Sequence, residues 1–168
     1  MKKNPDITRA YEYLSELLID DTRLDEAAEI IKKLDKIEHS PSINRMLARI
    51  AVRKGNYDEA KSLWDEITDE FSDNPTAWSY KADGYAGIGM YDKAIEFYSK
   101  SIALETPSRY IDNNLSMAHI YEINQNYKSA AAEYENIIDI LITYHGTPED
   151  GDVIEGYRRK VNKCLNKI

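Results

Sequence analysis

Apolar residues recur at helical spacing along most of the chain, with polar residues between them. From residue 41 to residue 71 they form two stripes, made of Ile43, Leu47, Ile50 and Ala51 and then of Ala60, Leu63, Trp64, Ile67 and Phe71. Spacings of three and four residues are typical of helices with one buried face. The Gly55-Asn56 break between the stripes is too short for anything but a tight turn. The pattern predicts a helical hairpin.

This hairpin pattern repeats. The hexamer GNYDEA, which closes at Ala60, recurs as GMYDKA, which closes at Ala94, 34 residues later. Weaker copies, TRLDEA and QNYKSA, close at Ala27 and Ala130, so the spacings are 33, 34 and 36 residues. A fixed period of this length predicts a stack of similar hairpins.

Residue size also recurs at fixed distances from the closing alanines. Small residues stand twelve positions before them, and large residues stand four positions after them: Ser15, Ala48, Ala82 and Ala118, then Ile31, Trp64, Tyr98 and Tyr134. Small residues are needed where two helices approach closely, and large ones fill the space beyond. Asn74-Pro75 and Thr106-Pro107 fit helix starts, with a capping residue before a first-turn proline.

The chain resembles the tetratricopeptide repeat family over roughly residues 7–144. The third unit matches its motif best, with Trp78, Ala82, Tyr85, Gly89, Tyr91, Ala94, Tyr98 and Pro107. The resemblance implies an all-α fold, a right-handed α-solenoid of about four hairpins in one domain over residues 1–168. The expected units are approximately 7–38, 41–73, 75–106 and 108–144. Two departures stand out, because Lys81 replaces the usual leucine and Thr22-Arg23 replaces the first turn glycine.

A further helix is expected at approximately 150–167, where it would cap the last hairpin. One side carries an apolar stripe, and the other carries Arg158, Arg159, Lys160, Lys163 and Lys167. The basic side has two interpretations, a solvated cap surface or a docking site for an acidic partner.

Charge and composition exclude several classes of function. A net charge of −8 argues against nucleic acid and anionic membranes as partners. Cys164 is the single cysteine, so no intrachain disulfide forms, and no apolar leader is apparent. We therefore expect a cytoplasmic protein. The three histidines lie in different units without a metal-ligand or catalytic motif, so we expect no cofactor, no metal, no catalytic residues and no enzymatic activity.

The resemblance implies binding of a peptide or partner protein along the concave surface of the first helices. Arg45, Arg49 and Arg53 share one helix face there, and no acidic residue occurs from Pro41 to Asn56. Arginine suits carboxylate recognition, so an acidic peptide is the predicted ligand. The further candidates in this groove are Tyr80, Asp83 and His119.

Two interpretations of the arginines stay open. They bind a ligand, or they only pair with Glu12, Glu16 and Asp20 of the first unit. The carboxylate clamp of chaperone-binding relatives is disfavoured, because Glu12, Glu16 and Tyr80 stand where lysine or asparagine would be needed.

The predicted function is therefore a non-enzymatic interaction scaffold. The alternative is a self-assembling adaptor, a homo-oligomer formed through the apolar face of the C-terminal helix or through an uncovered terminal hairpin. The first hypothesis expects Arg49→Glu to abolish partner binding with little change in melting temperature.

Overall fold

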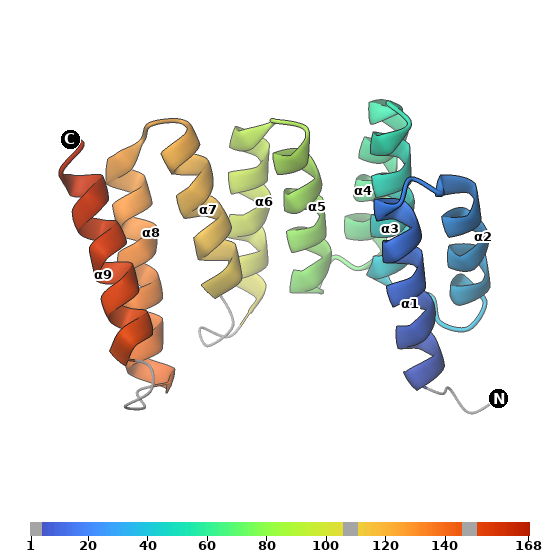
Figure 1. Ribbon diagram of the computed structural model, residues 1–168, viewed down its shortest axis with the longest axis horizontal. Coiled ribbons are helices and arrows are strands. Elements are labelled where there is room, and N and C mark those ends of the chain that lie inside the picture. The colour runs from blue at the N-terminus through green and yellow to red at the C-terminus, as the bar shows by residue number, and fades with distance from the viewer. Residues whose placement is uncertain (1–4, 106–110, 146–150) are drawn as a thin grey trace. The chain divides into compact units, whose positions relative to one another are not determined.

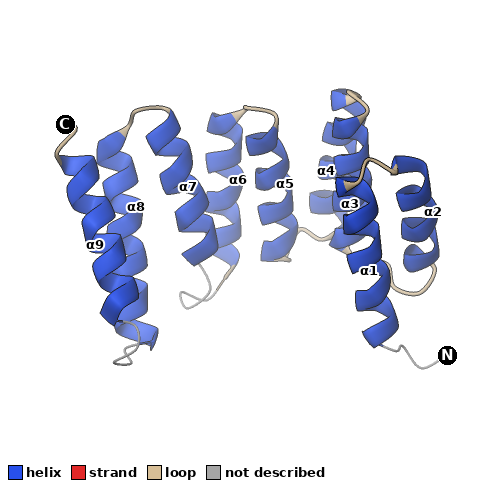
Figure 2. Ribbon diagram, in the orientation of Figure 1, coloured by secondary structure: helices blue, strands red, loops and turns tan. Residues whose placement is uncertain are grey.

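A computed structural model describes residues 5–105, 111–145 and 151–168 of the protein, and these residues form nine α-helices and one π-helical turn. In chain order they are α1 (Pro5–Asp20), α2 (Leu24–Asp35), α3 (Pro41–Arg53), α4 (Tyr57–Glu70), α5 (Pro75–Gly87), α6 (Tyr91–Leu104), α7 (Ile111–Ile123), α8 (Tyr127–Ile140), the π-helical turn η2 (Leu141–His145) and α9 (Gly151–Leu165) (Figure 1). No strand occurs in these ranges (Figure 2). The predicted all-α class is confirmed.

The chain divides into two compact units, residues 1–84 and 85–168, with the boundary inside α5. In the first unit α1 packs against α2, α2 against α3, and α3 against α4, and α1 also contacts α3. In the second unit α6 packs against α7, α7 against α8, and α8 against α9. The short turns after α1, α3 and α7 thus join helices that pack against each other, as the hexamers indicated. The single domain over residues 1–168 stays a prediction.

The small residues of the repeat mark the closest approaches between helices. Every closing alanine and every small residue twelve positions before it is fully buried: Ser15, Ala27, Ala48, Ala60, Ala82, Ala94, Ala118 and Ala130. The size pattern in the sequence therefore reports helix packing, since a larger side chain at these positions would meet the neighbouring backbone.

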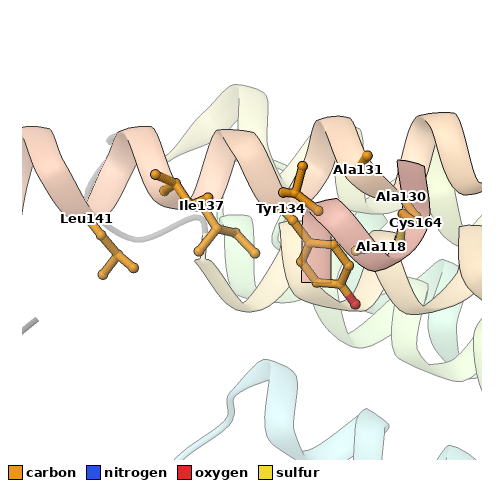
Figure 3. Packing of buried hydrophobic residues seen from close by; sticks show 9 residues of the cluster. Ala118, Ala130, Ala131, Tyr134, Ile137, Leu141 and Cys164 are labelled. Carbon is orange, nitrogen blue, oxygen red and sulfur yellow. The ribbon is translucent and has the colours of Figure 1, made fainter. Parts of the chain in front are cut away.

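Each unit buries its own apolar core. The core of the first unit contains Leu18, Ile19, Ala27, Ile31, Leu34, Ile43, Met46 and Ile50. The core of the second unit is drawn from three helices and η2 and contains Ala118, Ala130, Ala131, Tyr134, Ile137, Ile138, Leu141, Val161 and Cys164 (Figure 3). Because Val161 and Cys164 come from α9, this helix covers α8 as a cap would.

Two residues of α5, Gly84 and Lys81, are accommodated by contacts with α4. A side chain at Gly84 would come within 2.2 Å of the Trp64 indole, so glycine allows α5 to lie close to α4 there. The Lys81 ammonium is buried, and it lies 2.7 Å from the Asp65 carboxylate and donates to the Thr68 hydroxyl at 3.1 Å. A lysine can therefore occupy the place where relatives have leucine, since its charge is paired and its stem is apolar.

The prolines begin helices as expected. Pro41 opens α3, and Pro75 opens α5 after Asn74, whose side-chain oxygen accepts the backbone N–H of Thr76 at 2.9 Å. The expected Thr106-Pro107 start lies outside the described residues.

The hairpin turns share one backbone conformation at four equivalent positions. Gly55 and Gly89 have φ of 79° and 78°, and the matching residues Thr22 and Gln125 have φ of 61° and 57°. This left-handed region suits glycine and costs a β-branched residue such as threonine about 1–2 kcal/mol. The first hairpin therefore closes on a strained residue.

We predict that Thr22→Gly stabilises the protein by about 0.5–1 kcal/mol, because glycine removes this strain at a modest cost in chain entropy. The reverse change, Gly55→Thr, should destabilise by about 1–2 kcal/mol. Urea unfolding followed by circular dichroism measures both. A destabilising Thr22→Gly would show that the threonine side chain contributes an interaction larger than the strain.

His39 joins the first hairpin to the second. Its ring lies between two carboxylates, with Nδ1 2.5 Å from Asp35 of α2 and Nε2 3.0 Å from Glu70 of α4. The ring also lies 5.9 Å from that of Phe71. These hydrogen bonds, first to Asp35 and then to Glu70, raise the pKa of His39 above its ordinary value of 6.5.

A raised pKa makes part of the stability pH-dependent. The stabilisation is complete below about pH 6.5, the unfolded pKa, and is lost as the pH rises through the higher folded pKa. We expect the urea midpoint to fall slightly from about pH 6 to about pH 9, and His39→Gln to remove this slope. An unchanged slope in His39→Gln would assign it to other groups.

Candidate functional site

The predicted arginine ladder lies against carboxylates of α1. Arg45 donates to Glu16 at 2.5 Å, and Arg49 pairs with both Glu16 and Asp20, the latter at 2.9 Å. Arg53 lies 3.7 Å from the same Asp20 carboxylate. The ladder forms because residues four apart share a helix face and because α1 and α3 are in contact. The expected pairing is thus present for Glu16 and Asp20.

Glu12 has a different partner. Its carboxylate accepts a hydrogen bond from the Ser42 hydroxyl at 2.7 Å, at the start of α3. Among the described residues, no arginine forms an ion pair with it. Sequence spacing alone had placed Glu12 in the ladder, and no sequence signal pointed to Ser42.

The ladder changes character along its length. At its first step Arg45 is only 26% exposed, and its guanidinium also lies over the Tyr80 ring, 4.7 Å from the centroid. At its last step Arg53 is 47% exposed and has the long 3.7 Å contact with Asp20. The Arg45 end is closed by protein groups, whereas the Arg53 end is open to solvent.

At the open end two arginines share one of their carboxylate partners. Asp20 is shared by Arg49 and Arg53, while the neighbouring Lys54 pairs at 3.0 Å with Asp25 of α2. Partial burial, and then the nearby charge of Arg53, lower the pKa of Arg49. Arg49 and Arg53 therefore repel each other across the shared Asp20 carboxylate, and Glu16 neutralises Arg49 from its other side. A second carboxylate from a ligand would relieve this repulsion.

The remaining candidates do not all join this site. Tyr80 belongs to it through its contact with Arg45. Asp83 is exposed on α5 of the same unit. His119 is exposed on α7, near the exposed Ile123, and belongs to the second unit. Sequence analysis also missed the Lys54–Asp25 pair, which joins α3 to α2 and has no signature in the repeat pattern.

Among the described residues, no group of three or more histidine, cysteine, aspartate or glutamate side chains is arranged to hold a metal ion. None of the helices described is both long enough and apolar enough to cross a membrane.

The repeat is recognised independently by comparison with protein families. A family model described as tetratricopeptide repeat matches residues 45–107, which include the Gly55 and Gly89 turns. This part of the chain carries tetratricopeptide repeats. The Arg45–Arg53 ladder lies within the matched segment, on the first helix of a repeat.

Solved structures of tetratricopeptide repeat proteins are similar over most of the chain. MamA is 19% identical with a TM-score of 0.60, covering 87% of this chain and 85% of MamA. A tetratricopeptide repeat protein from Parabacteroides merdae is also 19% identical, with a TM-score of 0.61, covering 96% and 61% of the two chains. YrrB, described as having an unusual peptide-binding site, is 16% identical with a TM-score of 0.56, covering 82% and 71%. These similarities establish the solenoid fold.

One curated protein also matches in sequence. Farnesyl pyrophosphate synthase of Kluyveromyces lactis is 30% identical over 96 residues, which are 51% of this chain and 27% of the synthase. The chain thus spans about a quarter of that relative. Such a partial match does not assign the synthase activity here, and tetratricopeptide repeat proteins are typically scaffolds without catalysis.

Glu16 is the carboxylate on which the closed end of the ladder depends. We predict that Glu16→Gln destabilises the first unit by about 1–2 kcal/mol, because two partly buried guanidinium groups lose their shared partner. Arg45 Nε is already buried without a hydrogen-bond partner among the described residues, so it offers no compensation. Urea unfolding measures the change.

The matched control is Asp58→Asn, which breaks the exposed Asp58–Lys61 pair. Its expected effect is below about 0.5 kcal/mol. Equal losses in the two variants would mean that burial adds nothing to the ladder.

Proposed function

We propose that the protein is an interaction scaffold that binds an acidic segment of a partner at the open end of the arginine ladder. The observation that carries this proposal is the sharing of one carboxylate, Asp20, by Arg49 and Arg53. The partner's carboxylate would take the second place beside these guanidinium groups. Arginine presents paired N–H donors that match a carboxylate, which favours this chemistry over a neutral ligand.

The closed end supports the site without binding the ligand. Glu16 already occupies Arg45 and one side of Arg49, and Tyr80 covers the Arg45 guanidinium. A ligand there would have to displace protein carboxylates. Replacing one arginine–carboxylate pair by another adds little binding free energy. These contacts hold Arg49 in a fixed orientation, so less side-chain entropy is lost on binding.

The geometry changes the choice of test residue. Arg49→Glu would place a carboxylate between Glu16 and Asp20, so it should destabilise the fold as well as any complex. We therefore no longer expect Arg49→Glu to leave the melting temperature nearly unchanged. Arg53 is the better probe, because it is more exposed and has only the long contact with Asp20.

We predict that Arg53→Gln weakens binding to acidic peptides about five- to tenfold, as the loss of one charge-assisted contact implies. The probes are an array of extended peptides containing consecutive glutamates, each with a glutamine-substituted counterpart. Fluorescence anisotropy at low and at moderate salt measures the affinities, since charge-based binding weakens as salt rises.

The control is Arg158→Gln on α9. Arg158 is also exposed and has a similarly long 3.8 Å contact, with Glu155, so it matches Arg53 in charge and environment. Binding should not change in this variant. Equal binding by wild type and Arg53→Gln, or equal loss in both variants, would refute the proposed site.

The alternative of self-assembly through the C-terminal helix gains less support. The apolar side of α9 is used within the chain, where Val161 and Cys164 lie in the core of the second unit. Its basic side is exposed at Arg158, Arg159 and Lys163, which favours the solvated-cap interpretation.

A further inference from the structure

The open end of the arginine ladder is bordered by carboxylates as well as by basic groups. Asp20 lies 3.7 Å from Arg53, and Asp25, in the first turn of α2, lies 3.0 Å from Lys54. Asp21 directly follows Asp20 at the end of α1 and is exposed. We call Asp21 and Asp25 the acidic rim. A ligand that reaches the open end of the ladder therefore also comes close to this rim.

The rim carboxylates are more accessible than those inside the ladder. The Asp25 side chain is 95% exposed, whereas that of Glu16 is 24% exposed. Asp21 has no ion-pair partner among the described residues. The nearby Arg23 is already held by Glu26, which accepts from it at 2.8 and 2.6 Å. A cationic group of a ligand can therefore reach Asp21 without displacing another residue.

The end of α1 adds to the negative charge beside Asp21. A helix C-terminus carries a partial negative charge, which basic side chains in the last turn usually offset. The last turn of α1 contains no basic residue. Asp20 is balanced by Arg49 and Arg53 of α3, but Asp21 has no such balance. A positive group placed at Asp21 would be stabilised both by its carboxylate and by the end of the helix.

The charges around the open end do not favour a ligand that is acidic throughout. Carboxylates outnumber basic groups by one there, with Glu16, Asp20, Asp21 and Asp25 against Arg49, Arg53 and Lys54, while Arg23 and Glu26 cancel each other. A run of glutamates gains the contact with Arg53, but its other carboxylates are repelled by the rim. A basic residue close to the acidic one would turn this repulsion into attraction.

We propose that the partner segment is of mixed charge, with an acidic residue bound at Arg53 and a nearby basic residue bound at the acidic rim. This inference rests on the proposed function, and it names the second charge that the ladder's ligand carries. Asp21 and Asp25 are then the specificity-determining residues. They attract the basic residue, and they weaken the binding of segments that contain only acidic residues.

Peptides that repeat a glutamate–lysine pair test the proposal. In a series of them the lysine stands one to four positions after the glutamate, which covers neighbours in extended and in helical segments. Each peptide has one counterpart with glutamine and another with glutamate in place of lysine. Fluorescence anisotropy on the full chain at low salt measures the affinities. At least one lysine peptide should bind wild type about two- to fivefold more tightly than both of its counterparts.

The decisive variant replaces both rim residues, as Asp21→Asn with Asp25→Asn. It should abolish the advantage of lysine over glutamine. It should also strengthen binding of the all-glutamate peptides about two- to fivefold, because the repulsion is removed and Lys54 is released from Asp25. Circular dichroism verifies that the variant is folded.

The matched control is Asp139→Asn with Glu155→Gln, which removes the same number of charges from exposed positions of the second unit. Asp139 lies near the end of α8, as Asp21 does at the end of α1, and Glu155 pairs with a basic residue, as Asp25 does. The lysine advantage should persist in this control. Its absence in wild type, its survival in the rim variant or its loss in the control would each overturn the inference.

Arg53→Gln separates this inference from the proposed function. It should weaken binding of every peptide in the series, because each contains the glutamate that Arg53 binds. Unchanged affinities in Arg53→Gln would refute the ladder as the binding site, and the mixed-charge inference with it. Weaker binding in Arg53→Gln without a lysine advantage in wild type would refute the mixed-charge inference alone.

Discussion

The close approach of helices at small residues is the constraint on which the structure depends. All four closing alanines and their four small counterparts are fully buried, so each contact leaves no room for an added side chain. The bulky residues that follow, such as Trp64 and Tyr134, fill the space beyond each approach and are buried as well. Small and large residues therefore recur along the sequence at the same spacing as the buried helix contacts recur in the structure. A substitution at one of these alanines would separate two helices and displace whatever they carry.

The arginine ladder is a consequence of this packing. Because α1 and α3 lie in contact, a row of residues four apart on one helix meets a similar row on the other. The acidic and basic residues of the two rows do not pair one to one. Glu12 accepts a hydrogen bond from Ser42, and Asp20 pairs with two arginines. The result is a graded surface, closed by protein groups at Arg45 and exposed to solvent at Arg53. If the proposed site binds an acidic segment, this gradient would orient the partner, because its negative group would enter at the Arg53 end.

The same logic explains the two ends of the chain. A stacked hairpin always has an apolar side to cover, and the array must end with a helix that faces water. At the C-terminal end α9 meets this need with a buried apolar side and an exposed basic side. At the other end α1 has apolar residues on both sides.

Much of the fold could be predicted from the sequence, because repeated spacing of small, large and turn residues leaves few alternatives for a short helical hairpin. The hexamers located the turns, and the alanines located the close contacts. Thr22 and Gln125 show the limit, since they adopt the glycine conformation without being glycine. Neighbouring helices impose that conformation, and a single turn sequence does not report it.

The sequence predicted only part of the candidate site. The sequence by itself determined that Arg45, Arg49 and Arg53 share a helix face, because a helix has 3.6 residues per turn. Only the tertiary structure decided which carboxylates meet them, that Tyr80 closes one end, and that Asp20 is shared at the other. These outcomes depend on the offset between neighbouring helices and on side-chain direction. Both are set by packing across some thirty residues of chain, a separation at which local spacing carries no information.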